Sequence, residues 1–223
     1  MGNRDLKNFY EKYWENKEEK ILWRHNVAFT MVTPNSNVLD VGCGDGALGS
    51  LLIRQKNCRV TGVDLSSEAL KRAEKNGLRT LLLDVERETL PFKVNQFDCV
   101  IALDVLEHLH SPKDLLKKLL KVTRRSGIFS YGNVSWWRNR ARLLIGKVPP
   151  YAPFKCGQHL HYWNFYDFRD LLSSCNFIPL RYEVLGGIPL FGRVLPKDIE
   201  EGLVRLRPNL FGFGFVWETL VKK

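Results

Sequence analysis

The residues with the clearest chemical potential are the glycines and acids of one short block, Val38–Gly46, which reads VLDVGCGDG. Asp40 lies in an apolar run, and glycines follow at positions 42, 44 and 46 before a helix-like run from Ala47 to Ile53. Glycine has no Cβ, so the backbone N–H groups of such a loop can approach a nucleotide-like ligand closely. An acid just before the first glycine suits an uncharged nucleoside with an amino-acid tail better than it suits a pyrophosphate.

A dinucleotide-binding loop is the rival interpretation, because Gly44–Gly49 also satisfies G-x-G-x-x-G and Asp64 follows at about the interval of a ribose-binding acid. The Tyr-x-x-x-Lys spacing of short-chain dehydrogenases occurs at Tyr151–Lys155. Prolines at 149, 150 and 153 prevent that stretch from forming the helix that would align the two side chains. The same spacing at Tyr13–Lys17 precedes the glycine loop, which is the wrong place. A nicotinamide oxidoreductase is therefore a distant alternative.

Two further markers favour a different family. Asp84 closes a third apolar run, and an Asp-x-x-Glu-His sequence, Asp104–His108, closes a fourth. With these markers, the glycine block resembles the first motif of the class I S-adenosylmethionine (SAM)-dependent methyltransferases. The resemblance is specific over roughly residues 37–131 and implies SAM as the cofactor.

The same resemblance implies roles for the acids in holding SAM. Asp64 is expected to accept both ribose hydroxyls, and Asp84 to accept from the adenine amino group. Asp40 would anchor the loop or reach the amino group of the tail through water. Each acid alone is compatible with an N-cap or loop carboxylate, but three acids at successive strand ends indicate a site. The residues predicted to bind the cofactor are Asp40, Gly42, Gly44, Asp64, Leu65, Asp84, Val85 and Leu103.

Candidate catalytic residues follow the fourth predicted strand. In a helix, Asp104, Glu107 and His108 would share one face. The resemblance implies that this face supplies a general base, holds magnesium as in some ubiquinone-biosynthesis O-methyltransferases, or only shapes the pocket. His159 and His161 resemble a histidine-containing run that faces the acceptor pocket in related enzymes, and a histidine satisfied within a loop is equally compatible. We predict Glu107, His108 and His161 as catalytic, and no metal site.

The elements that position these residues are indicated by hydrophobic periodicity and capping residues. Strands alternate with helices, which implies a mostly parallel sheet that binds ligands beyond the carboxyl ends of its strands. We predict an α/β, three-layer Rossmann-like sheet with an antiparallel last strand and two N-terminal helices. The predicted strands are 37–41, 59–64, 79–83, 97–103, 127–132, 177–185 and 209–221. The predicted helices between them are 46–56, 66–76, 112–124 and 166–174, with a short one near Glu200.

The length of 223 residues is sufficient for one well-cored domain. We predict a single methyltransferase domain over residues 1–223, with an N-terminal helical lid at 1–34 and an insertion at 134–162 after the fifth strand. Tyr13 and Trp14 are expected to close over the cofactor, although aromatic residues at that spacing also serve as core.

The net charge of +10 is concentrated in Lys113–Lys147, which contains ten Lys or Arg and one acid, Asp114. A solvated helix face explains such a run, and a platform for a membrane surface, an acidic substrate or nucleic acid is the alternative. Trp136 and Trp137, with the arginines and aliphatic residues after them, would suit a membrane interface. The chain lacks the Asn/Asp-Pro-Pro-Tyr and Pro-Cys motifs of DNA methyltransferases, which argues against nucleic acid as a partner.

Five cysteines without a C-x-x-C pair favour reduced thiols and a cytoplasmic location. We also expect no signal peptide and no spanning helix, while peripheral membrane attachment stays open.

A further resemblance lies in GIFSYGNVSWWRNRARLLIGKVPPY and HLHYWNFYDFRDLL, which are similar to the MetW-type proteins of methionine biosynthesis. We therefore predict a SAM-dependent methyltransferase whose acceptor is an unidentified small molecule, methylated on oxygen or nitrogen. Two alternatives stay open: a SAM-binding regulatory protein without turnover, and a methyltransferase for a lipid-like acceptor at a membrane surface.

Overall fold

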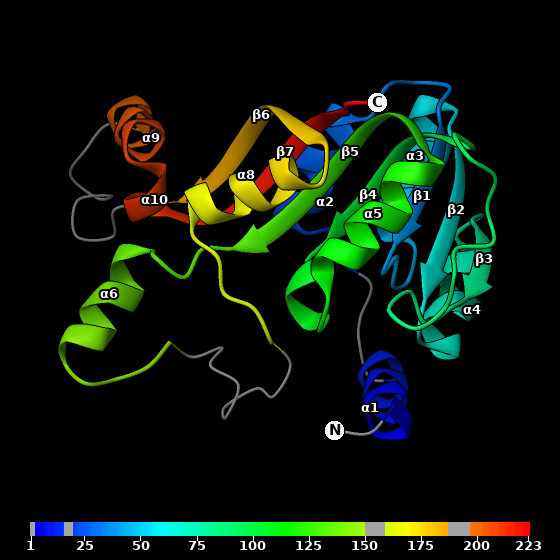
Figure 1. Ribbon diagram of the computed structural model, residues 1–223, viewed down its shortest axis with the longest axis horizontal. Coiled ribbons are helices and arrows are strands. Elements are labelled where there is room, and N and C mark those ends of the chain that lie inside the picture. The colour runs from blue at the N-terminus through cyan, green and yellow to red at the C-terminus, as the bar shows by residue number, and fades with distance from the viewer. Residues whose placement is uncertain (1–2, 16–19, 150–158, 187–196) are drawn as a thin grey trace.

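The computed structural model describes residues 3–15, 20–149, 159–186 and 197–223, which include a seven-stranded sheet (Figure 1). The strand order is β3-β2-β1-β4-β5-β7-β6. β7 is antiparallel to both of its neighbours, and the remaining pairs are parallel. The predicted fold class and the antiparallel last strand are therefore confirmed. The strands are β1 (Asn37–Val41), β2 (Arg59–Asp64), β3 (Arg79–Leu82), β4 (Phe97–Leu103), β5 (Thr123–Gly132), β6 (Phe177–Gly186) and β7 (Gly212–Val221).

The central strands β1 and β4 lie side by side, and their apolar side chains are buried on both faces of the sheet. This burial explains why both sequences are nearly continuous apolar runs. The strand order reverses between β1 and β4, so a crevice opens beyond their carboxyl ends. The predicted bounds of β1, β2 and β4 are confirmed.

Helices cover both faces of the sheet. One face packs against α2 (Trp23–Met31), α3 (Ala47–Lys56) and α4 (Ser67–Lys75), and the other against α5 (Pro112–Val122) and α8 (Phe165–Ser174). Consecutive residues of β1 alternate between these faces. Val38 belongs to the apolar cluster that includes residues of α2, α3 and α4. Leu39 belongs to the cluster that includes residues of α5 and α8.

Four helices lie outside these two layers (Figure 1). α1 (Asn3–Glu15) contacts α4 near the carboxyl end of β2, and α6 (Trp137–Leu144) lies within the predicted insertion. α9 (Lys197–Leu206) and the short α10 (Pro208–Phe211) precede β7. In the described part of the chain, no helix is both long and apolar enough to cross a membrane.

Three predicted boundaries were wrong by two or more residues. The last strand begins at Gly212 rather than at residue 209, because Pro208 starts the turn of helix α10. The helix predicted for 112–124 ends at Val122, and β5 begins at Thr123 instead of residue 127. Thr123 pairs with Phe97 of β4, so sheet pairing overrides the helical pattern there.

Candidate functional site

The glycine loop joins β1 to α3 through left-handed backbone conformations. Gly42, Gly44 and Gly46 have φ angles of 67°, 55° and 77°. A Cβ on Gly44 would lie 2.5 Å from the Cη2 atom of Trp14, which packs on the loop from α1. The loop sequence is thus required by both the turn and the close approach of the N-terminal helix.

Asp64, at the end of β2, holds this loop in place. One carboxylate oxygen accepts from the N–H of Gly44 and the other from the N–H of Ser66, each at 2.9 Å. Burial raises the pKa of Asp64 although these bonds favour its ionised form. Leu65 follows Asp64 in the chain and directly precedes Ser66, the N-cap of α4. Each carboxylate oxygen has further acceptor capacity, so the predicted contact with a ribose diol is chemically compatible with this structural role.

Asp40 lies in β1 behind the loop and is 5% exposed. Burial, together with the nearby carboxylates of Asp64 and Asp45, raises the pKa of Asp40 to about 7. A cationic group beside Asp40 would favour its charged form. An amino group or a sulfonium meets that requirement.

A cleft of about 80 Å³ opens between the glycine loop and the segment from Lys20 to His25. It brings together four residues that were predicted to bind the cofactor, Asp40, Gly42, Gly44 and Leu103, with basic side chains that sequence reasoning missed. The lining residues are Trp14, Lys20, Leu22, Arg24, His25, Asp40, Gly42, Cys43, Gly44, Asp45, Leu48 and Leu103. The mixture of buried acids and basic groups suits a zwitterionic amino-acid tail.

Glu11 fastens α1 over this region. Its carboxylate accepts from the hydroxyls of Ser66 and Ser67 and from the backbone N–H groups of Ser67 and Glu68, at 2.7–3.0 Å. Burial opposes ionisation of Glu11, but these bonds outweigh it and lower its pKa to about 2. Tyr10 also reaches the site. Burial raises its pKa to about 12, with the carboxylates of Asp64 and Glu107 adding to the effect.

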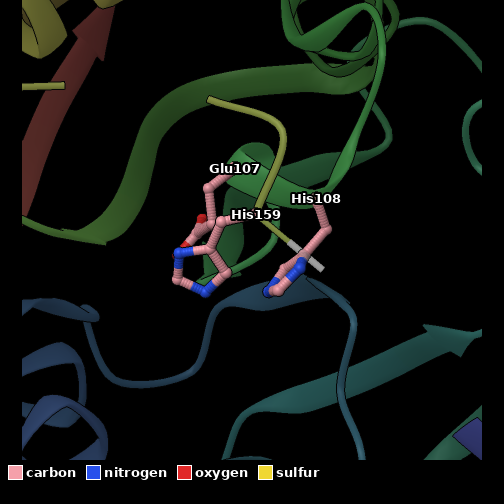
Figure 2. A group of neighbouring side chains, drawn as sticks. All are labelled: Glu107, His108 and His159. Carbon is pink, nitrogen blue, oxygen red and sulfur yellow. The ribbon is translucent and has the colours of Figure 1, made fainter. Parts of the chain in front are cut away.

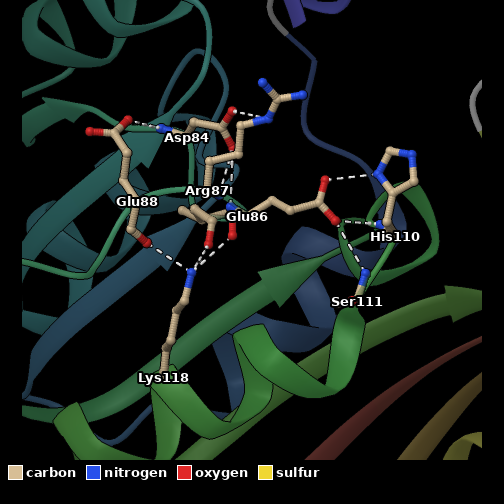
Figure 3. A network of polar contacts seen from close by, with 8 residues as sticks. Asp84, Glu86, Arg87, Glu88, His110, Ser111 and Lys118 are labelled. Carbon is tan, nitrogen blue, oxygen red and sulfur yellow. Dashed lines mark hydrogen bonds and ion pairs between the residues drawn. The ribbon is translucent and has the colours of Figure 1, made fainter. Parts of the chain in front are cut away.

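Asp84 and Val85 belong to a separate polar network beyond β3 (Figure 3). The Asp84 carboxylate accepts from the N–H groups of Glu86 and Arg87, at 3.1 and 3.3 Å. Lys118 of α5 donates to the carbonyls of Val85, Glu86 and Glu88 at 2.8–3.0 Å. Neither Asp84 nor Val85 lines the cleft, so their predicted contact with adenine stays a prediction.

The Asp-x-x-Glu-His sequence does not form the helical face considered from the sequence. Asp104 has a φ of 52°, and a short 3₁₀ helix, η1 (Leu106–His108), follows it. The Asp104 carboxylate accepts from the Ser130 hydroxyl at 2.5 Å and pairs with the Arg24 Nε at 3.0 Å. Glu107 is 4% exposed, and burial followed by the charge of Asp104 raises its pKa.

The two histidines of GQHLHYW separate in the structure. The ring of His161 stacks on Trp163, with centroids 5.2 Å apart, and its Nε2 lies 3.3 Å from the His110 carbonyl. The ring of His159 instead lies 4.8 Å from that of His108. The structure therefore brings His159, rather than the predicted His161, to Glu107 and His108.

A family model described as "Methionine biosynthesis protein MetW" matches residues 24–188, which is more than half of the chain. The chain belongs to the MetW family. The match spans the glycine loop, the Glu-His pair and the insertion that contains α6.

Several known proteins similar to this MetW-family chain are methyltransferases. The ubiquinone biosynthesis O-methyltransferase of Idiomarina loihiensis is 31% identical over 179 residues, covering 73% of this chain and 70% of that protein. A sterol 24-C-methyltransferase of Gibberella zeae is 32% identical over 111 residues, covering 47% of this chain but 28% of that protein. The magnesium protoporphyrin IX methyltransferase of Synechocystis PCC 6803, solved with bound SAH, has a TM-score of 0.65 and 16% identity, with 99% of each chain covered.

These comparisons confirm the predicted class I SAM-dependent methyltransferase superfamily, its Rossmann-like fold and SAM as its cofactor. They leave the acceptor undetermined.

Proposed function

We propose that this MetW-family protein transfers a methyl group from SAM to an oxygen or nitrogen of a small-molecule acceptor. The observation that carries the proposal is the cleft at the glycine loop, where the buried Asp40 lies close to the basic residues Lys20, Arg24 and His25. This charge pattern complements a ligand that carries both a carboxylate and cationic groups. SAM has this pattern, whereas a dinucleotide carries a negative pyrophosphate.

The residues present fit SAM chemically. Asp64 and the backbone of the glycine loop would hold the ribose and the tail, and Asp40 would face the cationic groups. Arg24 already pairs with Asp104 at the edge of the cleft, which places a cation where the tail carboxylate would enter. The cleft of about 80 Å³ is smaller than the roughly 300–1,000 Å³ of most ligand sites, so we expect lining side chains to move when SAM binds. Trp14, which lies against Gly44, is the side chain that we propose to move.

SAM supplies an activated methyl group on a sulfonium. Transfer of this methyl group requires that the acceptor be aligned with the carbon–sulfur bond and that water be excluded. The protein meets both requirements by the way it holds the two molecules. An amine acceptor needs no further help. A hydroxyl acceptor has to lose a proton, and Glu107 and His108 are the proposed groups near the carboxyl end of β4.

Calorimetric titration with SAM and, separately, with NADH tests the cofactor. We expect saturable heat with SAM and none with NADH. Asp64→Asn keeps the size of the side chain and should weaken SAM binding at least about tenfold, because charge-assisted hydrogen bonds are lost. Asp114→Asn, on an exposed part of α5, is the matched control and should bind like the wild type. Heat with NADH alone would overturn the proposal.

An acceptor screen with radiolabelled methyl-SAM then tests turnover. Methylation of a phenol, catechol or amine would support the enzyme. Cofactor binding with no acceptor in such a screen would favour the SAM-binding regulatory protein instead.

A lipid-like acceptor at a membrane surface is the second candidate, because α6 has an exposed apolar end. Leu143, Leu144 and Ile145 are 55%, 88% and 68% exposed, and Arg138 and Arg140 are exposed on the same helix. α6 lies away from the sheet (Figure 1). Aliphatic residues beside arginines suit insertion into an anionic interface. Two relatives carry names that refer to lipid-like molecules, ubiquinone in one case and a sterol in the other.

Co-sedimentation with phosphatidylserine-containing vesicles at low salt tests the surface. Leu144→Asp should abolish binding, whereas Leu206→Asp, at a 71% exposed position on α9, should not. The structure directs the test to Leu144 rather than to Trp136, because Trp136 is half-buried and packs against Phe213 with ring centroids 5.0 Å apart. Equal loss in both variants, or no binding by the wild type, would remove this candidate.

A further inference from the structure

Three potential metal ligands meet beyond the carboxyl end of β4 (Figure 2). Glu107 and His108 come from η1, and His159 comes from a segment about fifty residues later in the chain. One ligand atom from each residue lies within 4.8 Å of the other two. The rings of His108 and His159 are nearly perpendicular, at 87°.

Backbone hydrogen bonds build this meeting point. The N–H groups of Leu160 and His161 donate to the carbonyl of Glu107 at 2.7 and 3.2 Å. The segment that carries His159 is therefore fixed against η1 by main-chain contacts. These bonds bring the backbone next to His159 close to the backbone of Glu107.

Glu107 lacks a complete set of polar partners. Its side chain is 4% exposed, and its Oε2 atom has no hydrogen-bond partner in the described part of the chain. A buried carboxylate without partners is costly, so such groups are normally paired or bound to a metal. A cation held between Glu107 and the two imidazoles would satisfy this oxygen.

These three potential ligands differ from the group considered from the sequence, which contained Asp104 in place of His159. Asp104 is committed to Ser130 and to the guanidinium of Arg24, which makes it a poor ligand. His159 takes the third place instead. Two imidazoles and one carboxylate favour zinc or another divalent transition metal, whereas magnesium favours ligand sets made of oxygen atoms.

We propose that Glu107, His108 and His159 form a binding site for one divalent transition-metal ion, with zinc as the reference metal. Bonds from zinc to nitrogen or oxygen are about 2.0–2.2 Å long, so small side-chain rotations close the site around the ion. Three protein ligands leave a coordination position open, as in catalytic zinc sites.

The open position defines an acceptor class, and this step rests on the proposed methyl transfer. A hydroxyl bound to the metal loses its proton to solvent more readily. The resulting oxygen forms a bond to the methyl carbon of SAM while the carbon–sulfur bond breaks and its electron pair stays on sulfur. The site therefore favours a hydroxyl acceptor, such as a phenol or catechol, over an amine.

Equilibrium dialysis of the purified protein against zinc, with metal analysis, tests the site independently of turnover. We expect about one zinc per chain in the wild type. Glu107→Gln and His159→Ala should weaken zinc binding at least about tenfold, because even outer-shell changes at metal sites cost roughly 10–100-fold. His161→Ala is the matched control and should bind zinc within about twofold of the wild type.

Two further measurements keep the test decisive. SAM titration of each variant checks that it is folded, and it separates failure of the metal site from failure of the cofactor site. If a variant does not fold, the visible spectrum of the wild type with Co²⁺ replaces it, because Co²⁺ in a four- or five-coordinate protein site absorbs far more strongly than the hydrated ion. No zinc retained and no such spectrum, or equal loss in His161→Ala and His159→Ala, would overturn the proposal.

Discussion

Because Asp40 is proposed to face the cationic groups of SAM, we expect its carboxyl group to make SAM binding depend on pH. Its pKa of about 7 results first from burial and then from the charges of Asp64 and Asp45. A cationic ligand favours the ionised form and lowers this pKa, so SAM binding near pH 7 should release a fraction of a proton. Below pH 7 more of the acid is protonated, so proton release rises and affinity falls.

Titration calorimetry in phosphate and in Tris at pH 7 measures this release, because the two buffers differ in ionisation enthalpy. We expect different apparent enthalpies for the wild type and equal ones for Asp40→Asn. Equal enthalpies for the wild type would show that Asp40 does not meet the cationic part of the ligand.

The sequence indicated where the two histidines lie, but it did not predict what each ring contacts. GQHLHYW identifies two histidines near the acceptor side, but only the structure shows that the ring of His159 lies beside that of His108 while the ring of His161 stacks on Trp163. The roles of Arg24 and Glu11 were missed for the same reason. Their partners, Asp104 and the start of α4, are distant in the chain.

At the scale of elements, Glu11 clamps α1 to α4. Glu11→Gln should weaken this clamp, expose α1 to limited proteolysis and speed SAM association, because Trp14 then leaves Gly44 more readily. Glu15→Gln, at an exposed position on the same helix, is the control. Digestion time courses and stopped-flow binding measure the two effects. Unchanged proteolysis in Glu11→Gln would contradict the clamp.

The same clamp has a defined pH dependence. The folded pKa of Glu11 is about 2, below its ordinary value of 4.5. Its stabilising contribution is therefore complete above pH 4.5 and is lost as pH falls toward 2. Proteolysis by an acid-active protease should accelerate over this range in the wild type, but not in Glu11→Gln.

The second element-scale prediction concerns Lys118, which fastens the loop after β3 to α5 (Figure 3). Lys118→Met removes a charged donor from three carbonyls and should lower the free energy of unfolding by about 2 kcal/mol. Lys117→Met is the matched control, since Lys117 is exposed and pairs only with Asp114 at 3.6 Å among its described ion pairs. Urea denaturation measures both. Equal effects would show that the Lys118 contacts are energetically minor.

At the scale of the whole molecule, SAM should stabilise the fold by mass action. A ligand at about 100 times its Kd adds about 2.7 kcal/mol to the free energy of unfolding. For a chain of this length, that corresponds to an increase of about 5–10 °C in Tm. Differential scanning fluorimetry with a SAM dilution series measures it. A Tm that does not change with SAM concentration would contradict binding to the folded state.

The sequence by itself determined the architecture around the glycine loop. Strands β1, β2 and β4 were predicted with the correct bounds, and the helix predicted for residues 66–76 is present as α4, which Ser66 caps. These features depend on local properties. Apolar runs fit buried strands, glycine permits positive φ, and a hydroxyl caps the helix that follows it.

Only the tertiary structure decided how the side chains are used. It committed Asp64 to the N–H groups of Gly44 and Ser66, placed Trp14 over the loop and brought His159 to Glu107. The start of β5 at Thr123 also depended on its pairing with Phe97 of β4. Hydrophobic patterns are properties of neighbouring residues, whereas these contacts join segments that meet only after the sheet has formed, so no local pattern in the chain specifies them.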